Sequence, residues 1–250
     1  MSKAGWTRLA LLLALLALLE LLCRAGVIPS FTVIPPSAMA ASLAKILASG
    51  EYARDIAVTL GNVGIAIAAA TLAGVAFGTA LHGWPAARRV LEPLFATYYA
   101  VPMYAFYPLL IVVFGLGDLP QIAIGFLLAV MAVVINTLNG LDRVPAVLAK
   151  TARVHRLGPL AAALRVRLPY AAPYIFTGFK LAVAYAFIGV IGAEFITSSR
   201  GIGYEISYAY NNFDNALMYG MILLILALVV TLNMSLHAWE QRLLARRRRA

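Results

Sequence analysis

Charged residues, histidine and cysteine are all scarce in this chain of 250 residues. Asp, Glu, Lys and Arg make up 12% of it, whereas a soluble domain carries about 25%. The single cysteine, Cys23, excludes a disulfide framework and a cysteine-based metal site. The three histidines lie far apart and lack the HxxxH or HExxH spacing of zinc sites. The sequence therefore predicts neither a soluble domain nor a metal centre.

Signatures of nucleotide binding and of hydrolysis are missing as well. No G-x-x-x-x-G-K-[S/T] segment occurs, so the chain lacks the loop that holds nucleotide phosphates in P-loop ATPases. No G-x-S-x-G segment occurs, and the apolar runs contain no paired His and Ser and no carboxylate cluster. An intramembrane serine protease is thereby disfavoured.

Hydrophobic residues are instead abundant, at 63% of the chain with a mean hydropathy of +0.88. A run of about 20 apolar residues is enough to cross a bilayer. We expect an all-α membrane protein, because a helix satisfies its own backbone groups where lipid offers no partner. Six transmembrane helices are predicted, at 8–28, 56–81, 90–115, 119–140, 172–197 and 216–238.

The first apolar run has two interpretations. Lys3 and Arg8 precede a leucine-rich stretch, as in a cleaved signal peptide. No A-x-A-like cleavage site follows it, and Leu22 before Cys23 is too large for a lipoprotein-type site. A retained anchor helix is therefore the prediction.

Basic residues predict the orientation of the chain. With six spans, 15 of the 20 Lys and Arg residues fall on the side that holds both termini, and only Arg24, Lys45, Arg54 and Arg200 fall on the other. By the positive-inside rule both termini are cytoplasmic. The basic residues flank separate spans, which does not favour a nucleic-acid partner. The terminal arginines, 246–249, are expected to meet anionic membrane lipid.

One segment between spans, 141–171, is unusually long and carries several basic residues. Its pattern predicts a short surface helix with Val147, Leu148, Thr151 and Ala152 on one face. Gly158-Pro159 should break it, and a second amphipathic piece should run from Leu160 to Val166. We expect Pro169 and Pro173 to end that piece and to set the angle of the fifth span. A plain connector is the alternative, but long loops in compact domains are usually functional, which favours docking of a soluble partner.

Polar residues inside the predicted spans are candidates for lining a pathway. The third span carries Tyr98, Tyr99, Tyr104 and Tyr107, with Pro102 and Pro108 as expected kinks. The fourth carries Asn136 and Thr137, which either pack against other helices or line a translocation cavity.

Two charged residues and a glycine pair in the spans complete the candidates. Lys180 either extends to the cytoplasmic interface or lines the pathway. Glu194 ends the fifth span and is expected to be a structural or gate residue rather than a ligand contact. Gly74 and Gly78 form a GxxxG pair typical of close helix packing, within one subunit or across a dimer.

Several motifs resemble, in order and spacing, the permease subunits of bacterial binding-protein-dependent ABC importers of the nitrate/sulfonate/taurine type. They are VIPPSAMAASLAKILASGEYARDIAVTLGNVG (33–64), AVPMYAFYPLLIVVFGLGDLPQIAIGFL (100–127), INTLNGLDRVP (135–145), RLPYAAPYIFTGFKLAVAYAFIGVIGAEF (167–195) and SSRGIGYEI (198–206). The resemblance covers nearly the whole chain. It implies a type I ABC importer transmembrane domain with a cytoplasmic coupling helix.

In that family a motif E-A-A-x-x-x-G, followed by L-P, lies on the coupling helix that docks into a groove of the ATPase subunit. Its positions fall here on Lys150, Thr151, Ala152, Arg153, Arg156, Leu168 and Pro169, and Gly158 belongs to the same coupling loop. Ala152, Arg153, Leu168 and Pro169 agree with the pattern. Lys150 replaces its glutamate and Arg156 its glycine, so the usual charge pairing with the ATPase does not carry over.

The resemblance also implies partners and a division of the chain. It implies an N-terminal anchor and periplasmic segment over 1–55, the transmembrane domain over 56–240 and a basic tail over 241–250. The subunit would sit in the bacterial inner membrane with a second permease copy or paralogue, two ATPase subunits and a periplasmic binding protein. It would be a transport subunit and not an enzyme, because ATP and Mg²⁺ would be bound by the partner ATPase and no cofactor by this chain.

The transported solute is the least determined property. The resembled group imports small anions and organic molecules, so a small anionic or aromatic solute is expected. An ATP-independent secondary transporter is the alternative, although such proteins often contain inverted repeats and none is evident between 1–125 and 126–250.

Overall fold

The structure is a computed structural model that describes residues 3–247 and contains helices but no strand in that range. Arg248 and Arg249 of the predicted basic tail lie outside the described residues. The helices are α1 (Lys3–Arg24), α2 (Pro36–Ser49), α3 (Ala53–His82), α4 (Pro85–Thr97), α5 (Tyr107–Phe114), α6 (Asp118–Asp142), α7 (Ala146–Val154), α8 (Pro159–Ala162), α9 (Leu168–Thr197), α10 (Ile202–Asn211) and α11 (Asn215–Arg247). Short 3-10 turns, η1 (Tyr98–Ala100) and η2 (Met103–Phe106), and a π-helical segment, η3 (Ala163–Arg167), join some of them.

Within the described residues, five helices are long and apolar enough to span a membrane. They are Gly5–Arg24, Ala53–His82, Asp118–Asp142, Pro159–Thr197 and Asn215–Gln241. The pair Pro85–Ala100 and Met103–Phe114 makes a sixth if it is counted as one bent span. Long apolar helices therefore lie at each of the other five predicted spans.

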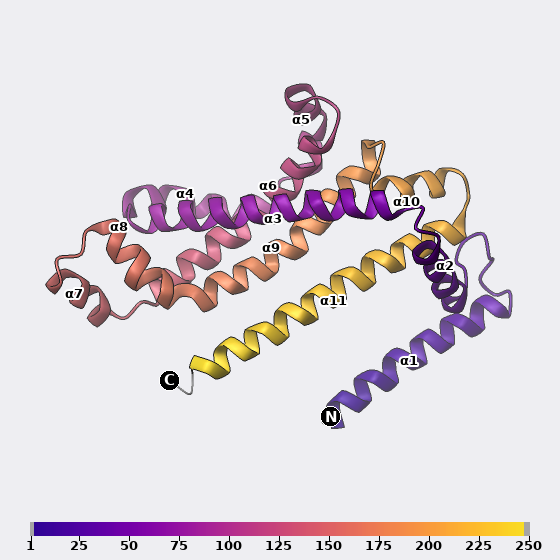
Figure 1. Cartoon of the computed structure of the whole chain (residues 1–250), viewed down its shortest axis with the longest axis horizontal. Helices are drawn as coiled ribbons and strands as arrows, with labels where there is room; N and C mark the ends of the chain where they lie inside the picture. The colour runs from indigo at the N-terminus through magenta and orange to yellow at the C-terminus, as the bar shows by residue number, and fades with distance from the viewer. Residues whose placement is uncertain (1–2, 248–250) are drawn as a thin grey trace.

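The third span, predicted at 90–115 with kinks at Pro102 and Pro108, is sharply bent. Its two halves meet at an angle of 90°, and α5 projects away from the layer of long helices in Figure 1. Pro102 lies in the break, between η1 and η2, and Pro108 lies at the start of α5. Proline lacks the backbone N–H that a continuous helix requires, so the chain starts a new helix after each expected kink.

Three long helices, α3, α6 and α9, form the centre of the fold (Figure 1). A Cβ built on Gly74 would lie 2.6 Å from the Cβ of Val133, and one on Gly189 would lie 2.6 Å from the Cα of Gly125. These positions are open only to glycine, because a side chain would collide with the neighbouring helix. The GxxxG pair in α3 therefore packs within this subunit, against α6.

The fifth span begins earlier than predicted. The helix runs without a break from Pro159 to Thr197 through η3, so the prediction that Pro169 and Pro173 end a separate surface piece is wrong. Pro169 lies in the first turn of α9, directly after the π-helical turn, and Pro173 lies inside α9. Proline is tolerated in the first turn of a helix, which suits Pro169, whereas Pro173 removes one backbone hydrogen bond inside α9.

A second apolar cluster joins α2, α10 and α11 at the end of the molecule opposite α7. Ile46, Ile202, Ile206, Met221 and Leu224 are buried there. By contrast, the most apolar stretch of α1 buries no residue against the rest of the chain. At its end, the Glu20 carboxylate accepts hydrogen bonds from Ser37 Oγ at 2.6 Å and from Arg24 Nε at 2.6 Å. These hydrogen bonds join the C-terminal end of the anchor helix to α2.

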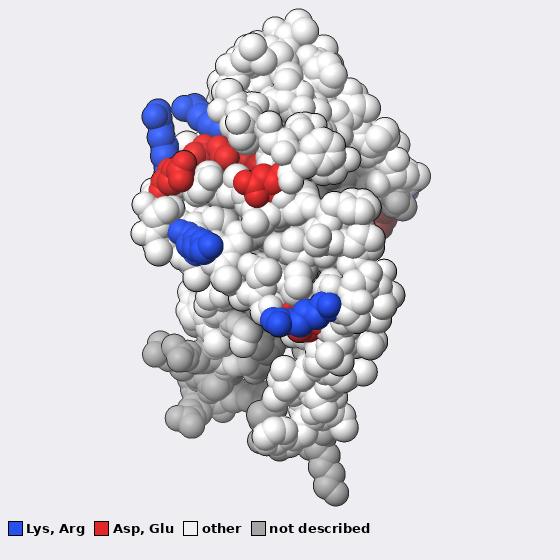
Figure 2. Space-filling view, turned by 90° about the vertical axis from the view of Figure 1, so that its right-hand side faces the viewer, with Lys and Arg blue, Asp and Glu red and all other residues white. Residues whose placement is uncertain are grey.

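Charge on the α10 end is sparse. Lys and Arg side chains on that end are few and separate, and most lie beside Asp or Glu on an otherwise uncharged face (Figure 2). The N-terminal end of α1 and the C-terminal end of α11 both point towards the side that carries α7 (Figure 1). This arrangement agrees with the charge asymmetry in the sequence.

Candidate functional site

The predicted coupling helix is present as α7, which projects from the end of the α3, α6 and α9 layer (Figure 1). Pro145 precedes it and Gly158-Pro159 follows it, so both ends of the helix are set by residues that disfavour its continuation. The residues of the motif, Lys150 to Arg156, all lie on α7 or in the turn after it.

The turn after α7 explains why the motif has a glycine at the position of Arg156. The backbone N–H of Leu157 donates to the carbonyl of Ala152 at 3.0 Å, and that of Arg156 donates to Arg153 at 2.9 Å. This pair of bonds is a Schellman motif, in which the residue after the helix cap is left-handed. Arg156 has a φ of +51°. Glycine adopts this conformation without the cost that a side chain adds.

The two faces of α7 differ in exposure. Ala152 is 6% exposed and Leu148 is half-buried, so these side chains face the body of the protein. Val147, at 64%, and Val154, at 79%, are exposed although apolar. Of the four residues predicted to share one face, Leu148 and Ala152 are at least partly buried, whereas Val147 and Thr151 are exposed. Lys150, Arg153 and Arg156 are exposed, and Gly158 is too.

An ion pair holds the start of this segment. Arg88 in α4 donates two hydrogen bonds to the Asp142 carboxylate, at 2.6 and 2.7 Å, and Asp142 is the last residue of α6. His82 Nδ1 at the end of α3 lies 3.3 Å from the same carboxylate, without hydrogen-bond geometry. Three helix ends therefore meet four residues before α7 begins. Arg143 adds a contact with the Tyr174 ring, at 4.9 Å from its centroid.

The four tyrosines of the third span mostly bind the backbone of neighbouring helices. Tyr98 donates to the carbonyl of Leu127 at 2.7 Å, Tyr104 to that of Ile188 at 2.5 Å, and Tyr107 to that of Thr197 at 3.1 Å. Tyr99 instead stacks on Tyr185, with 5.2 Å between ring centroids. The tyrosines fix the bent span to α6 and α9, and their role in lining a pathway stays a prediction.

The candidates in α6 and α9 lie apart from each other. Thr137 is fully buried against Gly78, and its hydroxyl has no partner in the part of the chain that the structure describes. The Asn136 amide donates to the carbonyl of Ala132 in its own helix at 2.8 Å. Lys180 pairs with Glu240 of α11 at 2.7 Å. The structure thus shows an ion pair for Lys180 and packing for Thr137, and lining of a pathway stays a prediction for each.

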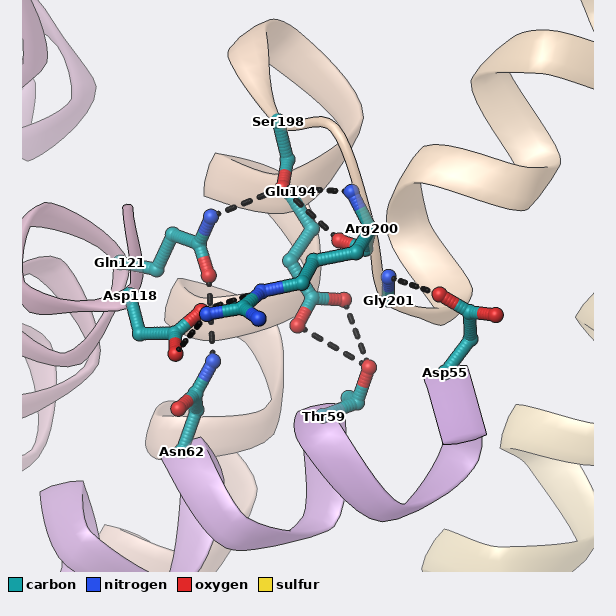
Figure 3. A network of polar contacts seen from close by, with 9 residues as sticks. All are labelled: Asp55, Thr59, Asn62, Asp118, Gln121, Glu194, Ser198, Arg200 and Gly201. Atoms are coloured by element: carbon teal, nitrogen blue, oxygen red, sulfur yellow. Dashed lines mark hydrogen bonds and ion pairs between the residues drawn. The ribbon is translucent and has the colours of Figure 1, made fainter. Parts of the chain in front are cut away.

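Glu194 belongs to a polar network at the end opposite α7 (Figure 3). Its carboxylate is 1% exposed and accepts hydrogen bonds from Thr59 Oγ1, at 2.8 and 3.0 Å, and from the backbone N–H of Gly203 at 3.0 Å. Thr59 Oγ1 in turn accepts from the N–H of Ile202 at 2.8 Å. The first turn of α10 is thereby bound to α3 and α9, since carboxylates favour the positive end of a helix.

The same network extends to α6 and to the loop after α9. Asn62 donates to Gln121 at 3.1 Å, and Gln121 donates to Ser198 at 2.9 Å. Arg200 pairs with Asp118 at 2.6 Å, and Asp55 accepts from the N–H of Gly201 at 2.8 Å (Figure 3). Sequence reasoning identified Glu194 but missed the partners of this network, which come from three segments far apart in the chain.

A metal centre has no support in the described residues, where no three His, Cys, Asp or Glu side chains lie close enough to hold an ion. The Glu194 network is saturated by internal hydrogen bonds. At one end of the molecule the short helix α7 is exposed, and at the other end the network binds the small helix α10 to α3 and α9.

The chain matches a protein-family model described as "binding-protein-dependent transport system inner membrane component" over residues 70–249. It is 33% identical to the nitrate import permease protein NrtB of Leptolyngbya laminosa, over 65% of this chain and 58% of that protein. It is 30% identical to NrtB of Synechococcus elongatus, over 63% of this chain and 56% of that protein. The taurine transport system permease protein TauC of Escherichia coli is 27% identical, over 76% of this chain and 69% of that protein.

The chain thus spans less than two thirds of the length of both NrtB proteins. The match to the family model begins inside α3, covers α6, α9 and the predicted coupling segment, and includes Glu194 but not the network members Asp55, Thr59 and Asn62 of α3. It includes most of the motifs that carry the resemblance. The chain belongs to the family of binding-protein-dependent transport system inner membrane components, and it is similar to permeases of nitrate and taurine transport systems.

Proposed function

We propose that this chain forms half of a transmembrane pathway for a small anionic or aromatic solute, driven by ATP hydrolysis in a partner subunit. A periplasmic binding protein would deliver the solute. The observation that carries the proposal is α7. It is an exposed helix between two central spans, closed by a left-handed turn at the motif's glycine position. A plain connector needs neither the projection nor the exposed Val147 and Val154.

The names of the relatives support the solute class. Nitrate and bicarbonate permeases handle small anions, and a taurine permease handles a small sulfonate. The assembly proposed is two permease subunits with two ATPase subunits and both termini in the cytoplasm. On this model Lys150 and Arg156 face an ATPase groove that offers carboxylates or backbone carbonyls, because an unpaired charge is costly to bury.

The test is assembly and coupling of the complex with the partner ATPase subunit of the importer. Lys150→Glu and Arg156→Glu should reduce ATPase co-purification, by about 2–5 kcal/mol in docking energy if the charge is buried. Arg165→Glu, at an exposed position in η3, is the matched charge reversal away from α7. Ala152→Asp tests the buried face of α7 against the protein body.

Substrate-stimulated ATP hydrolysis and uptake into proteoliposomes are the readouts. If all three α7 variants assemble and couple like the wild type, α7 does not transmit the power stroke. Solute uptake by the purified chain without any ATPase would instead support a secondary transporter and contradict the proposal.

A further inference from the structure

A cavity of about 740 Å³ lies beside the α7 segment. Its walls come from the C-terminal end of α3, the turn into α4, the end of α6, and the segment from α7 to η3. The ends of two candidate membrane spans, His82 of α3 and Asp142 of α6, bound this region. The cavity therefore lies at the level where the hydrocarbon core meets the headgroups.

Two arginines from different elements line the cavity. Arg153 comes from α7 and Arg167 from the end of η3. Neither forms an ion pair or a hydrogen bond through its side chain with another of the described residues. Asp142, which lines an adjoining hollow together with Arg167, already accepts hydrogen bonds from two guanidinium nitrogens of Arg88. Two positive charges thus face the cavity without a counter-ion.

A buried hydroxyl adds a second, independent observation. Thr79 lines the cavity, and its Oγ1 is buried without a hydrogen-bond partner among the described residues. A buried hydroxyl without a partner costs free energy, so such a group usually indicates a missing water or ligand. Together with Arg153 and Arg167, it gives the cavity three hydrogen-bond donors.

The rest of the lining is apolar. Leu141, Ala152 and Ala162 are buried and make part of the wall, and Leu160 is 72% exposed. Trp84 also lines the cavity and is 67% exposed, in the position at a span end where tryptophan meets lipid headgroups. A free inorganic anion would leave this apolar surface uncovered, whereas an amphiphile would cover it.

We propose that this cavity binds an anionic phospholipid, with its phosphate between Arg153 and Arg167 and its acyl chain along Trp84 and Leu160. Basic pockets beside transmembrane helices at the membrane surface suit such headgroups. The lipid would lie between α7 and the spans, so it would support α7 from the side opposite its exposed face. The proposal does not depend on ATPase docking, because the site is built entirely from this chain.

The experiment uses Trp84 as the reporter in the full chain. Trp6→Phe and Trp239→Phe leave Trp84 as the only tryptophan. This protein is reconstituted in vesicles that contain brominated phosphatidylglycerol or brominated phosphatidylcholine, whose bromine quenches tryptophan fluorescence on contact. We expect quenching to show a several-fold preference for phosphatidylglycerol. Arg153→Ala and Arg167→Ala should each lower this preference for phosphatidylglycerol about fivefold.

Three controls separate the site from general surface charge. Arg165→Ala, at an exposed position two residues before Arg167 and outside the cavity, should keep the preference. Arg153→Lys keeps the positive charge and should keep most of the preference for phosphatidylglycerol. That result would show that Arg153→Ala does not lose the preference through misfolding. Glycerol phosphate in solution should not compete, because it lacks the acyl chain.

Equal quenching by the two lipids would overturn the proposal. So would a preference that survives removal of both arginines, or one that Arg165→Ala abolishes to the same extent. Suppression of the preference by glycerol phosphate would show a site for a free phosphate rather than for a lipid. None of these outcomes bears on whether α7 docks an ATPase.

Discussion

At Arg156 the backbone takes the conformation that suits glycine, and an arginine side chain occupies it. Its φ of +51° closes the Schellman turn after α7. A non-glycine residue in the left-handed region costs about 1–2 kcal/mol. The family motif has glycine at this position. Arginine in its place adds backbone strain and puts a positive charge at the end of the predicted coupling segment.

We therefore predict that Arg156→Gly raises the thermal stability of the purified chain by about 1 kcal/mol, because glycine relieves the strain. Lys150→Gly, in the middle of α7, is the control and should lower stability by about 1 kcal/mol. Thermal unfolding in detergent measures both. A loss of stability in Arg156→Gly would show that the arginine side chain makes a contact worth more than the strain.

The buried carboxylate of Glu194 binds the first turn of α10 to the rest of the protein. It accepts hydrogen bonds from Thr59 and from the first turn of α10. Glu194→Ala would leave the Gly203 N–H and the Thr59 hydroxyl without this partner. An unsatisfied buried donor costs about 1–3 kcal/mol, so we expect a lower midpoint of thermal unfolding and faster proteolysis at α10.

Glu194→Gln keeps an oxygen acceptor and should lose less stability than Glu194→Ala. The exposed Glu51 is the control, and Glu51→Ala should change stability little. If Glu194→Ala unfolds at the wild-type temperature, the network does not hold α10 and its role lies elsewhere.

At the scale of elements, the contact between α6 and α9 depends on glycine at one crossing point. The Cβ of an alanine at position 189 would lie 2.6 Å from the Cα of Gly125 and 2.9 Å from its nitrogen. Both atoms are backbone and cannot move aside as a side chain would. The two helices have to separate to accept even a methyl group, which disturbs packing along their whole length.

Gly189→Ala should therefore destabilise the chain by about 1–3 kcal/mol, despite the higher helix propensity of alanine. Gly61→Ala is the matched control, because no atom lies within 4 Å of a Cβ built there. That change should stabilise α3 by about 1 kcal/mol through helix propensity alone. Thermal unfolding of both variants measures these changes. If Gly189→Ala does not change the stability, the two helices are not tightly packed at this crossing.

The bent third span shows how elements differ from sequence patterns. Apolar composition over 90–115 predicts one helix, and prolines at 102 and 108 predict kinks. In the structure the two halves of this span meet at an angle of 90°. Hydrogen bonds from Tyr98, Tyr104 and Tyr107 to α6 and α9 then hold the two pieces.

At the scale of the whole molecule, the charge asymmetry predicts the orientation in the membrane. Reporter fusions after residues 85 and 155 should score cytoplasmic, and fusions after 40, 117 and 208 should score periplasmic. The α10 end carries few basic residues (Figure 2), which supports this assignment. A single strongly inverted fusion would contradict the map, and alkaline phosphatase paired with a cytoplasmic fluorescent reporter gives the two independent readings.

The sequence by itself determined the class of protein, the position of most spans and the place of the short helix that we propose as the coupling helix. These depend on local properties: apolar length, the charge of short flanking segments, and residues such as Gly158 and Pro159 that end a helix wherever they occur. The motif around Ala152 and Arg156 could be recognised for the same reason, because its residues lie close together in the sequence.

Only the tertiary structure decided which polar residues meet. Thr59, Gln121 and Glu194 come from three helices, and nothing in the local sequence indicates that they share a network. The pairing of Lys180 with Glu240 and the cavity beside Arg153 and Arg167 likewise depend on how helices cross. Such contacts follow from packing between segments distant in the chain, where glycines set the distance of approach, and a periodic hydrophobic pattern does not specify a crossing point.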